Sequence, residues 1–117
     1  MSARTSDKCV TVEGRDIALD PEGYLIDMDE WTPGVAKALA AQEGRLLTEE
    51  HWEVIEVLRE FYRRYEMAPA MRPLVKVVGQ TLGAEKGKSL HLMKLFPESP
   101  AKVAARLAGL PKPTNCL

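Results

Sequence analysis

Apolar side chains recur at helical spacing along most of the chain. The strongest segment covers residues 48–65, where Thr48 is a candidate N-cap, Glu49 and Glu50 suit the first turn, and the apolar face is wide. We expect this segment to be the central helix and its aromatic residues to pack in the core. Four shorter helices are predicted between proline and glycine signals, over residues 32–44, 69–83, 89–95 and 100–108.

The N-terminal part follows a different pattern. Residues 10–12 and 17–19 are apolar runs that flank Glu13-Gly14-Arg15-Asp16, which predicts a small β-hairpin. The predicted fold class is therefore mainly α: a single-domain helical bundle with a small N-terminal β-hairpin. Residues 1–9 are expected to be loose, residues 10–108 to form the helical domain, and residues 109–117 to form a flexible C-terminal arm.

Composition narrows the functional classes. With 117 residues and 45% apolar content, the chain can bury one core. A formal net charge of -1 gives no general basis for nonspecific nucleic-acid binding. We find no apolar run near the length of about 18 residues that spans a bilayer, and no signal-peptide pattern at the N-terminus. A cytoplasmic protein whose two cysteines stay as thiols is expected.

The last nine residues hold the candidate chemistry, because Cys116 lies one residue from the C-terminus. Gly109 is suited to a hinge and to a helix C-cap. The prolines that follow favour an extended path, which spans roughly 22 Å from Gly109 to Cys116 at about 3.1 Å per residue. Two roles are open for Lys112. Its positive charge favours the thiolate form of Cys116, or its side chain contacts an acidic surface of a partner. We expect Cys116 to be exposed and the fold not to use the tail. The arm residues are Gly109, Leu110, Pro111, Lys112 and Pro113.

A collinear series of short motifs accompanies this tail. It comprises Glu22-Gly23-Tyr24-Leu25, Glu50-His51-Trp52, Phe61-Tyr62, Pro69-Ala70, Arg72, Glu85-Lys86-Gly87, Ser89, Leu95-Phe96-Pro97, Pro100-Ala101-Lys102, Gly109-Leu110-Pro111-Lys112-Pro113 and the penultimate Cys116. In order and approximate spacing, the series resembles the TusE/DsrC family of small sulfur-carrier proteins. The resemblance extends from about residue 10 to the end of the chain.

One position separates two kinds of member in that family. Members that work with dissimilatory sulfite reductase carry a second arm cysteine, and here that position is Ala105. The resemblance therefore favours the TusE type, in which Cys116 is the catalytic residue and takes up a persulfide without any bound cofactor. It implies a TusBCD-like sulfur donor complex and an MnmA-like tRNA thiouridylase as partners, with tRNA contacted only indirectly.

Other functions remain open from the residues alone. Lys88, His91 and Met93 stand where the family has an asparagine and two tyrosines, so a DsrC-like paralogue in sulfur oxidation is one alternative. A redox sensor that uses the tail thiol is another. A third is a DNA-binding regulator that presents residues 48–83 as a helical pair, although the charge balance disfavours it.

Several further residues have a plain structural interpretation beside a functional one. The basic residues Arg72, Lys76, Lys86 and Lys88 form either a solvated face or a docking patch for a partner beside the arm. Cys9 is interpreted as an ordinary residue at the edge of the hairpin, and His51 as a surface or capping residue. Because His51 and His91 lie far apart without a cysteine pair, no metal site is predicted.

Overall fold

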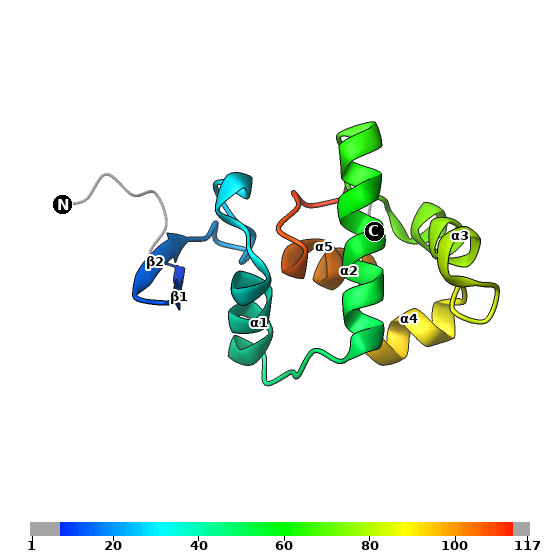
Figure 1. The fold of residues 1–117 in the computed structure, drawn as a ribbon, viewed down its shortest axis with the longest axis horizontal. Helices are drawn as coiled ribbons and strands as arrows, with labels where there is room; N and C mark the ends of the chain where they lie inside the picture. The colour runs from blue at the N-terminus through cyan, green and yellow to red at the C-terminus, as the bar shows by residue number, and fades with distance from the viewer. Residues whose placement is uncertain (1–7, 114–117) are drawn as a thin grey trace.

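The computed structural model describes residues 8–113, and within this range the chain forms five α-helices, one short 3₁₀ helix and a two-stranded antiparallel sheet. In Figure 1 the hairpin lies at one end, α3 and α4 lie at the other, and α2 crosses in front of α5 between them. The elements are β1 (Cys9–Val12), β2 (Arg15–Ala18), η1 (Met28–Glu30), α1 (Pro33–Gln42), α2 (Glu49–Tyr65), α3 (Met71–Leu82), α4 (Ser89–Leu95) and α5 (Pro100–Leu107). The predicted fold class is confirmed.

A two-residue turn connects the strands of the hairpin. Glu13 and Gly14 both have positive φ, at 51° and 81°, as a type I′ turn requires. The turn is thus shorter than the predicted four residues, and Cys9 pairs with Ala18 as the first residue of β1. Val10 and Ile17 face each other across the ladder, and both are buried. This apolar side of the hairpin covers α1.

The helix boundaries follow the predicted capping signals closely. Thr32 caps α1 by accepting a hydrogen bond from the Val35 N–H at 3.2 Å. At the start of α2, the Thr48 N–H donates to Nδ1 of His51 at 3.0 Å, so His51 is a capping residue as expected. It is buried, however, and Nε2–H donates to the Leu95 carbonyl at 2.9 Å, which ties α2 to the end of α4.

Two expectations about the helices are wrong. The third helix begins at Met71 rather than at residue 69, and Pro73 stands in its first turn, where a missing N–H breaks no intrahelical bond. Tyr65, expected in the core, is exposed at the last turn of α2, where its ring packs on Phe61 with 4.6 Å between the ring centroids. The wide apolar pattern of α2 extends one turn beyond its buried part.

The core is centred on α5. Ala104, Ala105 and Leu107 are fully buried, and α5 contacts α1, α2, α3 and α4. The small side chains of α5 allow the other helices to approach it closely. No helix in the described part of the chain is long and apolar enough to cross a membrane.

Candidate functional site

The predicted catalytic residue, Cys116, lies outside the described residues, as does everything from residue 114 onward. The structure describes the arm from Gly109 to Pro113 and the part of the domain from which the arm departs. The site can therefore be built from the residues that fix this departure.

Gly109 ends α5 in a Schellman motif. The Leu110 N–H donates to the Ala105 carbonyl at 2.9 Å, and the Gly109 N–H donates to the Arg106 carbonyl at 3.2 Å. Gly109 has φ 76°, a left-handed conformation that glycine adopts without strain. Its predicted role as a C-cap is confirmed, whereas its role as a hinge stays a prediction.

Trp31 and Arg59 hold the end of α5 from two sides. The Trp31 indole Nε1–H donates to the Leu107 carbonyl at 2.8 Å, and Arg59 Nη1–H donates to the Ala108 carbonyl at 2.7 Å. The Arg59 guanidinium also lies over the Trp31 ring, 3.9 Å from its centroid, in a cation–π contact. A side-chain carbon on Gly109 would come within 2.4 Å of Trp31. We call Trp31 and Arg59 the arm-root clamp.

The electrostatic setting of Arg59 follows from this packing. Burial lowers the pKa of Arg59 from its ordinary value, and the nearby positive charge of Arg63 lowers it further. Arg59 nevertheless stays protonated at neutral pH, because an arginine titrates far above this range. It therefore serves as a fixed cation and hydrogen-bond donor at the start of the arm.

The next residues of the arm lie against the domain. Leu110 is only 2% exposed and belongs to the core cluster, and Pro113 is buried as well. Between them, Pro111 and Lys112 are exposed, and Lys112 Nζ pairs with Glu22 Oε2 at 3.1 Å. The expectation that the fold does not use the tail is thus wrong for residues 110–113, because Leu110 fills part of the core. The mobility of the arm as a whole stays a prediction.

Ala105, the position of the second cysteine in one branch of the resembling family, is fully buried in α5. Its carbonyl accepts the hydrogen bond that reverses the chain into the arm. The backbone of residue 105 is therefore part of the turn from which the arm leaves. Ala105 itself offers no thiol.

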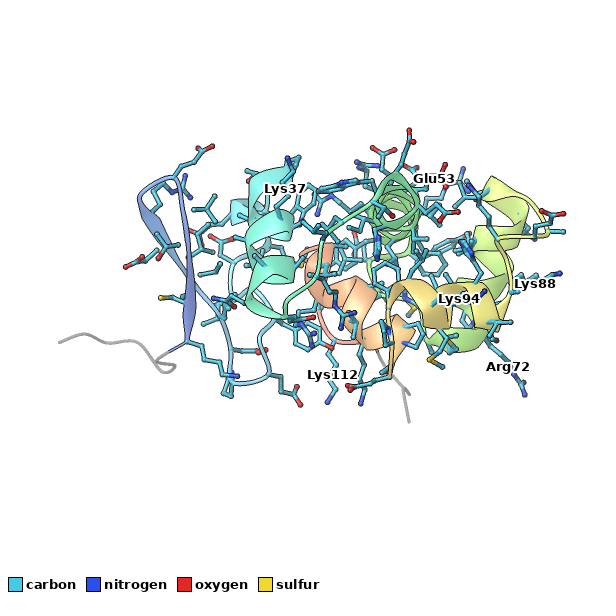
Figure 2. The ribbon with its side chains drawn as sticks, turned by 90° about the horizontal axis from the view of Figure 1, so that it is seen from below. Lys37, Glu53, Arg72, Lys88, Lys94 and Lys112 are labelled. Carbon is cyan, nitrogen blue, oxygen red and sulfur yellow. The ribbon has the colours of Figure 1, made fainter. Side chains whose placement is uncertain are left out.

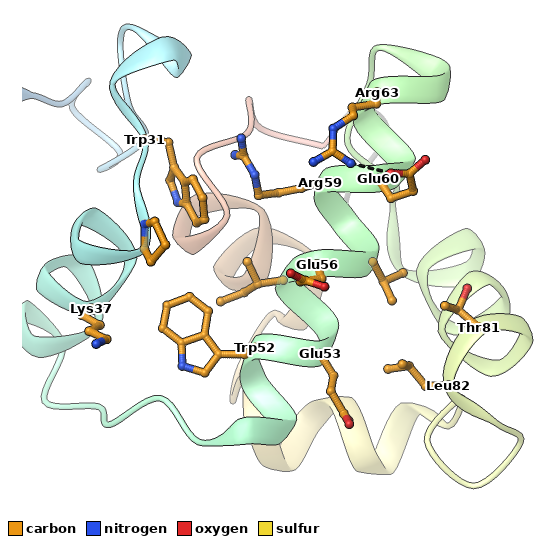
Figure 3. Close-up of a pocket in the computed structure, with 13 residues that line it drawn as sticks. Trp31, Lys37, Trp52, Glu53, Glu56, Arg59, Glu60, Arg63, Thr81 and Leu82 are labelled. Atoms are coloured by element: carbon orange, nitrogen blue, oxygen red, sulfur yellow. Dashed lines mark hydrogen bonds and ion pairs between the residues drawn. The ribbon is translucent and has the colours of Figure 1, made fainter.

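A groove of about 790 Å³ lies beside the arm-root clamp, between α1, α2 and α3. Figure 3 shows Trp31 and Trp52 facing into it, with Lys37 near one end and Leu82 from α3 across from them. Arg59 lines the groove and also donates a hydrogen bond to the Ala108 carbonyl. The charged residues that line the groove carry both signs, so it has no marked preference for an anion or a cation.

The four basic residues predicted to face a partner lie at the α3–α4 end of the molecule. Arg72 and Lys76 are exposed on α3, and Lys88 is exposed directly before α4. Lys86 is engaged differently: its Nζ donates to Glu53 Oε1 at 2.6 Å, and this hydrogen bond is the main reason that the pKa of Lys86 is raised. A docking role for all four stays a prediction.

Cys9 is a free, half-buried thiol in β1. In residues 8–113 no three His, Cys, Asp or Glu side chains are grouped as metal ligands would be.

The sequence gives no sign that Trp31 and Arg59 contact the arm. Both act on the backbone of α5, more than forty positions away in the chain. A local pattern carries no signal for such pairs.

The chain is similar to known proteins in sequence and in fold. Residues 11–117 match the family model described as "DsrC like protein". The protein named "Sulfurtransferase TusE" from Pectobacterium atrosepticum is 52% identical over 105 residues, which cover 90% of this chain and 96% of that relative.

Two solved structures have the same fold. The NMR structure of Allochromatium vinosum DsrC superposes with a TM-score of 0.85 at 53% identity, covering 93% of this chain and 97% of that one. The crystal structure of the oxidized gamma-subunit of the dissimilatory sulfite reductase (DsrC) from Archaeoglobus fulgidus gives 0.83 at 41% identity, covering 94% and 100%. Overall identity thus does not separate the two kinds of relative.

Proposed function

This chain belongs to the DsrC-like protein family, and we propose that within it the chain acts as a sulfurtransferase of the TusE type that carries sulfur as a persulfide on Cys116. The observation that carries the proposal is the combination of Cys116 in the penultimate position with a buried alanine at position 105. A single arm thiol can pass sulfur between proteins but cannot close an intramolecular bridge within the arm.

The chemistry needs no oxidant. The thiolate of Cys116 attacks the outer sulfur of a persulfide on the donor, the S–S bond of the donor breaks, and the thiolate of the donor leaves. Cys116 then holds the outer sulfur as its own persulfide. A second attack of the same kind, by a thiolate of the acceptor on that outer sulfur, regenerates the thiolate of Cys116.

The described part of the arm supports this role by fixing where the carrier segment starts. The arm-root clamp and Leu110 hold the backbone up to residue 110, and Cys116 follows six positions later. Six positions span at most about 22 Å when fully extended, at up to about 3.6 Å per residue. A partner must therefore dock within that distance of residue 110 to exchange sulfur with the thiol.

The proposed partners are a TusBCD-like donor complex and an MnmA-like tRNA thiouridylase, in the cytoplasm, with tRNA held by the thiouridylase. The test is a reconstitution in which persulfide-loaded chain is mixed with the thiouridylase and tRNA, and 2-thiouridine is measured by mass spectrometry. We expect product with the wild type and with Cys9→Ser, and none with Cys116→Ser. Inorganic sulfide serves as a control sulfur source that shows the enzyme to be active.

One observation favours a second candidate. The DsrC of Allochromatium vinosum is as similar in sequence as the TusE relatives are, so a DsrC-like paralogue in sulfur oxidation remains an alternative. The same reconstitution separates the two. A chain that loads sulfur at Cys116 but yields no 2-thiouridine, while sulfide does, would favour the alternative.

A further inference from the structure

One side of α4 exposes apolar side chains to solvent. Leu90 is 68% exposed and Met93 is 42% exposed, and Lys94 is exposed beside them. Met93 and Lys94 lie three and four positions after Leu90, so they are on the same side of the helix as Leu90. The other face buries Leu92 and Leu95, which means that α4 is anchored by one side and presents the other.

Basic residues outnumber acidic ones in the segment that contains this face. The segment 67–97 contains five lysine and arginine residues and a single acid, Glu85, and one of the five, Lys86, is paired with Glu53 of α2. Arg72 and Lys76 lie one helical turn apart on the exposed side of α3. We define the α3–α4 surface by Arg72, Lys76, Lys88, Leu90, Met93 and Lys94.

Arg72 of this surface points to the same side as Lys112 of the arm. In Figure 2, Arg72, Lys88 and Lys94 lie at the α3–α4 end, and Arg72 and Lys112 point to the same side, away from Lys37 and Glu53. A partner that receives the arm on that side can contact Arg72 as well. The groove between Trp31 and Trp52 faces the other side, with Lys37 and Glu53.

We propose that the α3–α4 surface docks an acidic protein surface with an apolar centre on a sulfur-relay partner. The exposed Leu90 and Met93 favour a protein over a nucleic acid, because a phosphate backbone offers nothing apolar to cover them, whereas protein interfaces have an apolar core and a polar rim. The inference rests on the proposed relay function and names the chemistry of its partner.

The two kinds of residue have different tasks in such an interface. The basic rim of the α3–α4 surface consists of Arg72, Lys76, Lys88 and Lys94, and it raises the rate of association with an acidic partner. Salt screens this attraction, so the association rate falls as the ionic strength rises. Leu90 and Met93 supply the contact area that slows dissociation.

The test measures the initial rate of sulfur transfer from a persulfide-loaded TusBCD-like complex to the full chain, and from the loaded chain to the MnmA-like thiouridylase. The variants are Lys76→Glu/Lys94→Glu for the rim and Leu90→Ser/Met93→Ser for the centre. Lys37→Glu and Leu46→Ser are matched controls, since both residues are exposed and lie outside this surface. Thermal melts establish that every variant is folded.

We expect the two surface variants to slow transfer with at least one partner by on the order of 10-fold, and the rim variant to lose most of the salt dependence of the rate. The controls should stay within about 2-fold of wild type. A small-molecule persulfide donor needs no docking, so it should load Cys116 equally in all variants. Failure of that loading in the wild type would overturn the relay function itself.

Two results would overturn the docking inference alone. One is a rim variant that exchanges sulfur with both partners at the wild-type rate. The other is a combination of results with tRNA. The wild-type chain would bind tRNA in a salt-dependent manner, the rim variant would have lost this binding, and both would transfer sulfur to and from the partner proteins at the normal rate. That second pattern would assign the surface to RNA.

Discussion

The guanidinium of Arg59 lies 3.9 Å from the centre of the Trp31 ring, and each of the two side chains donates a hydrogen bond to the end of α5. Trp31 precedes α1, while Arg59 is in the middle of α2. The pair therefore joins two helices to the residue at which the arm begins. Position and direction of the arm depend on contacts that the arm itself does not supply.

Removing one member of this pair should lower stability. Arg59→Ala leaves the Ala108 carbonyl without its side-chain donor, and we expect a loss of about 1–3 kcal/mol in the free energy of unfolding. Trp31→Phe keeps a ring but removes the donor to Leu107, at a cost of about 1 kcal/mol. Urea unfolding of both single variants and of the double variant measures these losses. Strictly additive losses would contradict a coupled clamp.

The close contact of Gly109 makes it intolerant of any side chain. In Gly109→Ala the new carbon meets Trp31 and the backbone keeps a positive φ, so we expect a loss of at least about 2 kcal/mol. Gly44→Ala is the matched control, because Gly44 has φ 73° but open space around it. It should cost only the backbone strain, about 1 kcal/mol. Equal losses in the two variants would show that the Trp31 contact is unimportant.

Two truncations separate the structural part of the arm from the chemical part. Ending the chain after residue 109 removes the buried Leu110 and should cost about 2–5 kcal/mol. Ending it after residue 113 keeps Leu110, Pro113 and the Lys112–Glu22 pair and should leave the melting temperature nearly unchanged, with sulfur loading abolished. Differential scanning calorimetry distinguishes them. A stable chain that ends at residue 109 would contradict the burial of Leu110.

Ala105→Cys tests whether the arm can fold back over α5. The carbonyl of residue 105 accepts the hydrogen bond of the turn at Leu110, and five residues separate Leu110 from Cys116. We expect mild oxidation to form an intramolecular disulfide, seen as a loss of both free thiols without dimerisation. Because position 105 is fully buried, bridging should be slower than the reaction of Cys116 with a small disulfide reagent. Persistent free thiols would mean that the arm does not reach this position.

The sequence predicted the secondary structure well where local signals act. Thr32 and Thr48 mark helix starts, Gly83 and Gly109 mark helix ends, and α4 has the predicted bounds. Such signals depend on a few neighbouring residues, which is why they can be seen without a structure. The sequence places the start of α3 two residues too early, because Pro69 resembles a proline at a helix start. The proline in the first turn of α3 is instead Pro73.

The candidate site could be predicted only in part. Cys116 and its prolines were identified from their place at the chain end and from the family motifs. The packing of Leu110 and the clamp of Trp31 and Arg59 join distant segments, and apolar periodicity does not predict which backbone carbonyl a tryptophan or an arginine will reach. For the same reason the sequence suggested a wholly free arm, whereas residues 110–113 lie on the domain.

The most direct test of the account is the intact mass of the chain after incubation with a cysteine desulfurase, cysteine and a relay protein. Wild type and Cys9→Ser should each gain the mass of one sulfur atom, the gain should disappear with reductant, and Cys116→Ser should gain nothing. A gain that persists in Cys116→Ser, or the absence of any gain in the wild type with a competent donor, would contradict a persulfide carrier centred on Cys116.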